Sequence, residues 1–338
     1  MCTLRLLATS VMLSSLLGLS ACGGGGGGYG GGGGGMPTGA AGSKAFAADS
    51  PHSMIGSLIN PNPGPGTIMV DRTIGGMFNY PGFSTNIGSL ALDTANDRLY
   101  VGNGTSIRVF NGASQANGDI FPSRVITNNP ASGNTGSLFL DTVNNRLYVG
   151  DDVAGVRVFD NASGISGATA STRLINGNFG GSFQIHGVAV DTSSKNILYV
   201  SNSVSSTNQI SVFDSASTVD GSSTAPNRTI TPNPASGVGG IFLDAANDRL
   251  YVASGSASTV MVFNTASAAN GTTAPARTMT FPSTITSVFV ETVNDRLYAV
   301  SLAAIYVLSS ASTASGTVTA TAVLAPSGGG FTAVAVAP

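Results

Sequence analysis

Few residues in this chain have side chains suited to catalysis or to metal binding. The 338 residues include 14 Lys and Arg, 16 Asp and Glu, two histidines and two cysteines. The candidates are His186, Cys22 and a carboxylate that recurs at regular spacing. A histidine could act as a general base or contact an anionic ligand, and repeated carboxylates could bind calcium. Because only 9% of the residues are charged, no basic surface of the size that nucleic acid requires can form, and nucleic acid is not an expected partner.

The chemistry expected of Cys22 is lipidation. The basic Arg5 precedes an apolar run over 6–18, and Leu19-Ser20-Ala21-Cys22 follows, which is typical of a secretory signal. This ending resembles the lipobox of bacterial lipoproteins, and the resemblance implies that Cys22 is the lipidated first residue of the mature chain. Since Gly23 follows, it also implies an outer-membrane lipoprotein of a Gram-negative cell envelope, with the membrane as a partner. An ordinary secretory peptide that has a cysteine near its cleavage site is the alternative.

The chain divides into three segments by composition. Residues 1–21 form the predicted signal peptide, and residues 22–43 are nearly all glycine after Cys22. Glycine has no side chain to bury and loses the most backbone entropy on folding, so 22–43 is expected to be a flexible tether. Residues 44–338 hold strand-like and turn-like sequence with abundant Ser, Thr and Asn, which favours an all-β domain.

An internal repeat organises the third segment. Five units share an apolar run, an Asp or Glu, a short polar turn and Leu-Tyr. They are SLALDTANDRLYV (89–101), SLFLDTVNNRLYV (137–149), GVAVDTSSKNILYV (187–200), GIFLDAANDRLYV (240–252) and SVFVETVNDRLYA (287–299). A strand ending in Phe or Leu follows each, then Ala-Ser with a Gly four residues after the Ser, then a last strand that carries Arg in four units. Four short strands every 47 to 52 residues are typical of the blades of a β-propeller.

A sixth unit is split between the two ends of the repeat region. Residues 44–47, 55–58 and 69–74 align with the second, third and fourth strands of a blade, and 332–336 aligns with the missing first strand. We therefore expect a six-bladed propeller of four-stranded blades, closed by the C-terminal strand joining the N-terminal blade. Proline two residues before the arginine of several fourth strands predicts that this strand is the outer edge, where arginine discourages pairing with another molecule.

The repeat resembles the NHL/YVTN group of bacterial β-propellers in its G-x-x-L-D…NDRLYV and VF-x-x-AS-x-x-x-G elements. That group contains binding modules, scaffolds, lactonases and lyases, so the resemblance implies a fold and leaves the function open. Enzymes with this architecture work at the central channel, where a six-bladed metal-dependent lactonase is expected to gather Glu, Asp and Asn as ligands.

The channel positions of this chain are small and uncharged. Five residues before the repeated carboxylate stand Gly88, Gly136, His186, Gly239, Thr286 and Thr332. One residue later stand Ser89, Ser137, Gly187, Gly240, Ser287 and Ala333. Because none is a carboxylate or Asn, no metal site and no cofactor are expected. His186 is a catalytic candidate without an evident partner, since the other histidine, His52, falls in a loop of the terminal blade; a solvated or core-bonded histidine is the alternative.

The residues that recur in every blade are expected to be structural. The repeated carboxylates should cap hairpin turns, and the repeated aromatic residues should pack between blades. The carboxylates are Asp93, Asp141, Asp191, Asp244 and Glu291; the aromatic residues are Tyr100, Tyr148, Tyr199, Tyr251 and Tyr298 with Phe110, Phe159, Phe213 and Phe263. The pair Asp151-Asp152 is expected to be a solvated hairpin.

These observations favour a non-catalytic, lipid-anchored envelope module that binds or organises a protein, a polysaccharide or a small ligand. Loops that differ in length between repeats, at 77–86 and 201–209, are where a binding face would vary. A lactonase-like hydrolase or lyase that uses His186 at the central channel is the alternative.

Overall fold

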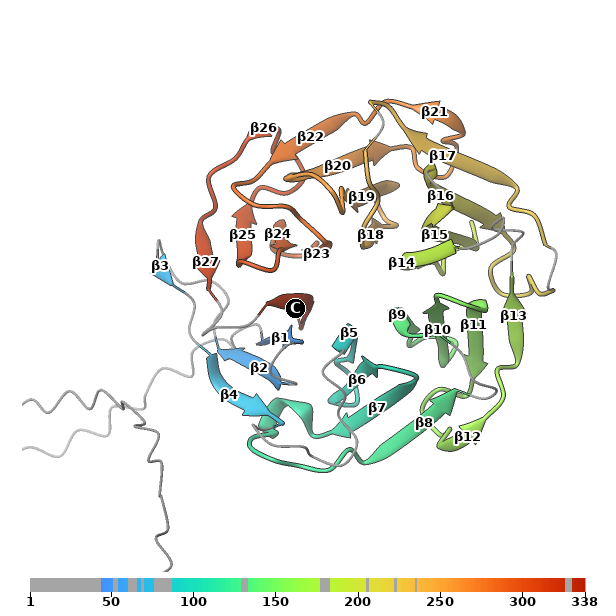
Figure 1. Ribbon diagram of the computed structural model, residues 1–338, viewed down its shortest axis with the longest axis vertical. Coiled ribbons are helices and arrows are strands. Elements are labelled where there is room, and N and C mark those ends of the chain that lie inside the picture. Colours follow the sequence, from blue (N-terminus) through green and yellow to red (C-terminus); the bar gives the residue numbers. More distant parts are fainter. Residues whose placement is uncertain are drawn as a thin grey trace, which may run out of the picture. The chain divides into compact units, whose positions relative to one another are not determined.

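Six β-sheets form a closed ring in the computed structural model (Figure 1). The structure describes residues 44–50, 54–59, 66–67, 70–75, 87–128, 133–176, 183–204, 207–221, 224–234, 236–325 and 330–337. These residues contain 28 strands and one short 3-10 helix, η1 (Ala113–Gln115). The predicted signal peptide, Cys22, the tether and His52 lie outside the described residues. The all-β, six-bladed propeller expected from the repeat is confirmed.

Each sheet contributes one strand to the centre of the ring and three strands outside it. The inner strands are β28 (Phe331–Val336), β5 (Ile87–Asp93), β9 (Thr135–Asp141), β14 (Phe183–Asp191), β18 (Ile241–Asp244) and β23 (Ser287–Glu291). The second strands are β1 (Lys44–Asp49), β6 (Arg98–Asn103), β10 (Arg146–Asp151), β15 (Ile197–Val204), β19 (Arg249–Ala253) and β24 (Arg296–Val300).

The outer half of each sheet follows the same order. The third strands are β2 (Met54–Ile59), β7 (Ser106–Asn111), β11 (Gly155–Asp160), β16 (Thr207–Asp214), β20 (Thr259–Asn264) and β25 (Ile305–Ser309). The fourth strands are β4 (Val70–Ile74), β8 (Arg124–Asn128), β13 (Arg173–Ile175), β17 (Arg228–Pro232), β22 (Arg277–Thr280) and β27 (Ala322–Leu324). Four further strands are very short: β3 (Gly66–Thr67), β12 (Gly167–Thr169), β21 (Gly271–Thr273) and β26 (Gly316–Thr317).

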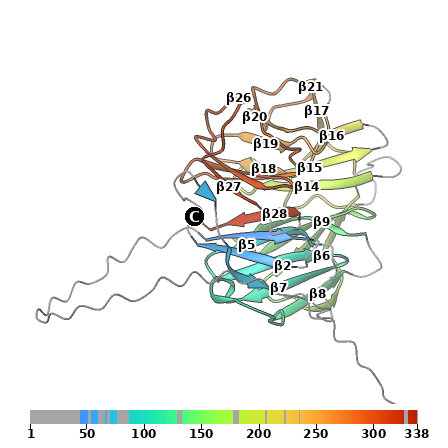
Figure 2. The same ribbon diagram turned by 60° about the vertical axis from the view of Figure 1, so that its left-hand side comes forward.

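The two ends of the repeat region share one sheet, as expected. Its strand order is β28-β1-β2-β4, and β28 pairs antiparallel with β1 through Ala45↔Val336 and Phe46↔Ala335. Figure 2 shows β28 beside the N-terminal strands although nearly 300 residues separate them in the sequence. This pairing closes the ring and removes the two free blade edges that an open array would expose.

The hydrophobic core lies between neighbouring sheets in six clusters. In one of them Tyr100 of β6 packs with Phe159 of β11 and with Ala162 of the next blade. The aromatic side chains of the repeat are among the largest fully buried residues. Because each cluster joins two sheets, the ring is stabilised by the burial of apolar surface between blades rather than by the core of any one blade.

The turns between first and second strands depend on the repeated carboxylates. Asp141 Oδ1 accepts a hydrogen bond of 2.9 Å from the backbone N–H of Asn144, and Asp93 and Asp244 do the same with Asn96 and Asn247. The residue that follows this Asn, or follows the residue in its place in other turns, has a positive φ. Its side chain binds the Ala-Ser segment: Asp97, for example, accepts hydrogen bonds of 2.8 Å from both N–H and Oγ of Ser114. The turn and the outer connection of a blade are thus held together.

The prediction that the fourth strand is the outer edge is confirmed in two sheets, which end on β4 and on β13, and is wrong in the other four. In four sheets a strand from the next blade's outer connection pairs in parallel with it, beginning at or next to the repeated glycine, as in Ile126↔Gly167. In the other two sheets a single parallel bridge stands there, Ile74↔Gly118 and Ile175↔Gly221. The Ala-Ser-x-x-x-Gly element therefore connects five of the blades to the blade before them, and Gly66 occupies the glycine position in the sixth. The one-dimensional repeat did not reveal this role.

The arginine of the fourth strand bonds to backbone carbonyls of this strap segment. Arg124 Nη1 donates to the carbonyls of Ala162 (3.3 Å) and Ile165 (2.8 Å) in the next blade, and Arg173 donates to Ala216 and Val219. The hydroxyls of Tyr100 and Tyr148 donate to the same alanine carbonyls at 3.3 and 3.2 Å. Each such group of Tyr, Arg and Ala-Ser carbonyls locks two blades together.

Truncation after Gly330 tests the closure. The deletion removes β28, in which Phe331, Val334 and Val336 are buried, and each such side chain contributes about 1.5–3 kcal/mol. We expect the cooperative unfolding transition to be lost or to shift far to lower temperature. Circular dichroism during heating measures it, with Val293→Asp at an exposed turn as the control. A truncated chain with the unfolding midpoint of the full chain would contradict closure.

Two tyrosines in equivalent positions test the blade lock. Tyr148 Oη donates to Ala216, whereas Tyr199 Oη is buried with no hydrogen-bond partner among the described residues. We expect Tyr148→Phe to lower the free energy of unfolding by about 1 kcal/mol and Tyr199→Phe to leave it unchanged or raise it, because only the first change removes a bond. Urea denaturation of both variants gives the comparison, and equal losses would refute it.

Candidate ligand-binding channel

The inner strands begin with β-bulges that bring the predicted channel residues to the axis. The register of pairing shifts so that Gly88, Gly136, His186 and Thr332 are each the extra residue in their strand. Gly239 and Thr286 hold the equivalent positions before β18 and β23. We call these six residues, together with the residue that follows each of them, the hub. A bulge re-aims the side chain of the extra residue, which is why bulges recur beside functional sites.

The glycines of the hub stand where neighbouring backbones leave no space for a side chain. A methyl group at Gly88 would stand 2.6 Å from the carbonyl oxygen of Thr135, and one at Gly136 would stand 2.8 Å from that of Ile185. Gly239 is crowded in the same way by Thr286. The absence of carboxylates at these positions thus has a steric cause that is independent of function.

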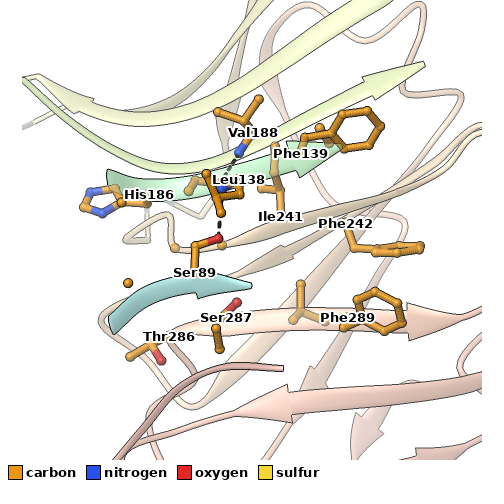
Figure 3. Close-up of a pocket in the computed structure, with 18 of the residues that line it drawn as sticks. Ser89, Leu138, Phe139, His186, Val188, Ile241, Phe242, Thr286, Ser287 and Phe289 are labelled. Carbon is orange, nitrogen blue, oxygen red and sulfur yellow. Dashed lines mark hydrogen bonds between the residues drawn. The ribbon is translucent and has the colours of Figure 1, made fainter. Parts of the chain in front are cut away.

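Serine hydroxyls complete the contacts between adjacent inner strands. Ser89 Oγ accepts from the backbone N–H of Leu138 at 2.8 Å, and Ser137 Oγ accepts from that of Val188 at 2.9 Å (Figure 3). At the closing blade, Thr332 Oγ1 donates to the carbonyl of Ile87 at 2.7 Å. These hydroxyls satisfy backbone groups that face the axis, where no further strand can pair with them.

A cavity of about 630 Å³ runs along the axis between the inner strands. Its volume lies within the range of small-molecule sites, about 300–1,000 Å³. Residues of all six blades line it, and of the described lining residues only Asp152 and His186 are ionisable. The cavity therefore offers hydrogen bonds and apolar surface and little formal charge.

Polar side chains gather at one end of the cavity, on the second and third blades, where the blade of β5 is counted as the first. We define the polar cluster as Asp152, Gln184, His186, Ser203 and Asn208. Asp152 Oδ1 accepts from the backbone N–H of Ile185 at 3.2 Å, and Ser203 pairs with both Gln184 and Asn208 across the sheet. The second-blade loop and the β14–β15–β16 hairpins thereby bring these residues together from positions up to 56 residues apart.

His186 is partnered, contrary to what its sequence context indicated. Its Nε2 lies 3.0 Å from Ser203 Oγ, and the ring is half-buried. Burial lowers the pKa of His186, so the neutral imidazole predominates at neutral pH. Burial raises the pKa of Asp152, and the neighbouring Asp151 adds to this. The two ionisable groups of the cavity are thus both shifted toward their uncharged forms.

The expectation of a solvated Asp151-Asp152 hairpin is wrong. Asp151 is completely buried, and its carboxylate forms an ion pair with Arg157 at 3.1 Å. It also accepts backbone hydrogen bonds from Gly133, Val153 and Ala154. Asp151 holds the loop in place, so that its neighbour Asp152 faces the cavity, an assignment that the sequence could not make because the two residues are chemically identical.

Aromatic side chains lie at the other end of the cavity, away from His186 (Figure 3). We define the aromatic cluster as Phe139, Phe242 and Phe289. Phe242 and Phe289 meet edge to face with ring centroids 5.0 Å apart, and Phe289 similarly contacts Tyr298 at 6.4 Å. All three rings are only partly buried. Sequence reasoning missed this cluster, although its signal was visible: the position two residues before the repeated carboxylate is Phe in three blades and Ala in the others.

No group of three His, Cys, Asp or Glu side chains within the described parts of the chain is arranged to hold a metal ion. The repeated carboxylates face their own turns; Glu291, for instance, accepts from Asn294 and from Tyr298 Oη. In the same described residues, no helix has the length and apolar character needed to cross a membrane.

No protein-family model and no curated protein matches the chain. Solved structures do match it, 964 chains in all. One is a chain in the "Crystal structure of Nidogen/Laminin Complex", with a TM-score of 0.60 and 14% identity over 88% of this chain and 99% of that chain. The likeness is one of fold. It supports the propeller implied by the NHL/YVTN resemblance, whereas membership of that group remains an expectation from sequence.

The lowered pKa of His186 predicts how stability depends on pH. Protonation favours the unfolded chain, where the histidine pKa is about 6.5. The wild-type protein should therefore lose stability relative to His186→Gln as the pH falls below about 6.5, and the difference should be constant above about pH 7.5. Urea denaturation from about pH 8 to about pH 5 measures both curves. Parallel curves would contradict the burial of a neutral imidazole.

Proposed function

We propose that this chain is a non-catalytic binding module whose ligand enters the central channel and contacts the polar cluster. The observation that carries the proposal is that the cluster breaks the six-fold repeat. Where His186 stands, other blades have Gly or Thr, and where Asp152 stands, three of them have Gly104, Gly255 and Leu302. Residues that recur in all blades are needed for the blades to fold, whereas the side chains of Asp152 and His186 are not required to build a blade.

The channel also has the physical character of a binding site. It is concave, has an adequate volume and combines apolar side chains with convergent polar groups. Propellers present such a channel on a rigid frame, and a chain of the nidogen/laminin complex shares this fold. That complex is an assembly of proteins by its title, which supports a binding role for the fold in general.

We place this module at the bacterial cell envelope, anchored by lipid on Cys22. The proposal rests on the lipobox-like segment that ends at Cys22 and on the glycine-rich residues after it. A tether of this composition would let the propeller reach ligands away from the membrane. Mass spectrometry of Cys22 from the membrane fraction, with Cys22→Ser as the unlipidated comparison, addresses the anchor separately from the binding role.

A hydrolase or lyase is the second candidate, and one observation favours it. His186 Nε2 and Ser203 Oγ are within hydrogen-bonding distance at 3.0 Å, the arrangement by which a base activates a nucleophile. The carboxylate of Asp152 bonds to the backbone N–H of Ile185, and burial is the effect that shifts the pKa of His186. The orienting acid that completes such a triad is thus engaged elsewhere, which makes binding the better supported role.

Turnover assays and binding assays on matched variants separate the two functions. We expect no hydrolysis of lactones or esters by the wild-type protein, and binding of a neutral polysaccharide or small ligand that Asp152→Asn and His186→Gln each weaken about five-fold or more. Calorimetry measures binding, and Val293→Ser, at an exposed turn remote from the cavity, is the control. Turnover that Ser203→Ala abolishes, or binding unaffected by both cavity variants, would overturn the proposed function.

A further inference from the structure

Polar side chains line one end of the channel and aromatic side chains line the other. This difference between the two ends does not follow from the repeat. The polar cluster comes from the second and third blades, and the aromatic cluster from the second, fourth and fifth. Figure 3 shows His186 and the rings of Phe139, Phe242 and Phe289 on opposite sides of the hub residues Ser89 and Ser287. A ligand that lies along the axis therefore meets two different environments.

The polar end offers neutral hydrogen-bonding groups of both kinds. Gln184 and Asn208 each carry an amide that donates and accepts, and the second ring nitrogen of His186 is directed away from the contact with Ser203. The carboxyl group of Asp152, whose pKa burial raises toward the uncharged form, adds a further acceptor. Since no Lys or Arg is among the described lining residues, an anionic head group finds no counter-charge at this end.

The aromatic end offers partly exposed apolar surface that the fold does not cover. Phe242 and Phe289 contact each other, and Leu140 and Leu243 line the cavity beside the cluster. The other three blades line the cavity with Ala91, Ala189 and Ala335 at the phenylalanine position. Apolar surface facing an enclosed space favours an aliphatic or aromatic group over water.

We infer that the channel binds an uncharged amphipathic small molecule. Its hydroxyl-bearing or amide-bearing head occupies the polar cluster, and its aliphatic or aromatic body packs against Phe139, Phe242 and Phe289. The inference rests on the proposed binding function and narrows it to one class of ligand. A neutral sugar head fits the mixed donors and acceptors, and the volume of about 630 Å³ accommodates a head with a short chain.

Four probes that differ in their tail or in their head group test the inference. Octyl β-glucoside has a neutral head and a tail, methyl β-glucoside lacks the tail, and octanoate and octylammonium carry opposite charges on the same tail. Calorimetry below the micellar concentration should show octyl β-glucoside binding with one equivalent, at least about ten-fold tighter than each of the other three.

Variants at the two ends locate the bound molecule. Gln184→Ala and Asn208→Ala should weaken the octyl glucoside about three-fold to ten-fold. Phe242→Ala should weaken octyl β-glucoside more than methyl β-glucoside, and Phe242→Leu, which keeps apolar volume, should restore part of the affinity. Val293→Ser is the control outside the cavity, and thermal unfolding establishes that each variant is folded.

The outcomes distinguish this inference from the proposed function. Equal affinity for the methyl and octyl glucosides, tighter binding of a charged probe, or octyl glucoside binding that ignores both sets of variants would overturn the amphipathic ligand. Binding of a polysaccharide or protein that Asp152→Asn weakens, with no affinity for octyl glucoside, would overturn the inference and leave the binding module standing. Turnover dependent on Ser203 would overturn the proposed function itself.

Discussion

Six strand edges that converge on one axis leave little room for side chains, and this steric limit governs the centre of the molecule. The inner strands meet through bulges at which glycine, serine or threonine permits close approach of backbone to backbone. The contacts continue around the ring because β28 stands between β23 and β5 and its Thr332 bonds to Ile87. Without that last strand, β1 and β5 would each lose a neighbour. The closed geometry, the small hub and the axial cavity are consequences of the same convergence.

Most of the repeated residues whose side chains could take part in catalysis or binding instead hold neighbouring blades together. The hydroxyls of Tyr100, Tyr148 and Tyr251 meet the fourth-strand arginines of their blades at an alanine carbonyl of the Ala-Ser segment, and the turn residues bind its serine. The repeated glycine then begins the strap along the preceding blade. Arg124 and Arg173 are therefore held by specific acceptors in a neighbouring blade, a use of charge that adds cohesion between sheets whose own edges cannot pair directly.

Departures from the repeat are the informative positions for function. Asp152 and His186 stand where other blades have residues that do not ionise, and both face the cavity. The aromatic cluster is a second departure, since three blades have Phe where three have Ala. The symmetric frame thus carries an asymmetric channel, with groups suited to hydrogen bonding at one end and to apolar contact at the other. Functional residues that vary on a rigid scaffold are a common arrangement in proteins.

The amino-acid sequence by itself determined the number of blades, the order of strands in each and the closure by residues 332–336, because turns and alternating apolar residues are local features that recur at a fixed period. It also placed the residues of the hub correctly. It did not reveal the parallel straps or the arginine contacts, since these join different repeats and have no periodic signal of their own. Only the tertiary structure decided that Asp151 is buried against Arg157 while Asp152 faces the channel, and that His186 meets Ser203. Such pairings depend on which side chains the folded backbone aims at one point in space, and the spacing of residues along a chain does not contain that direction.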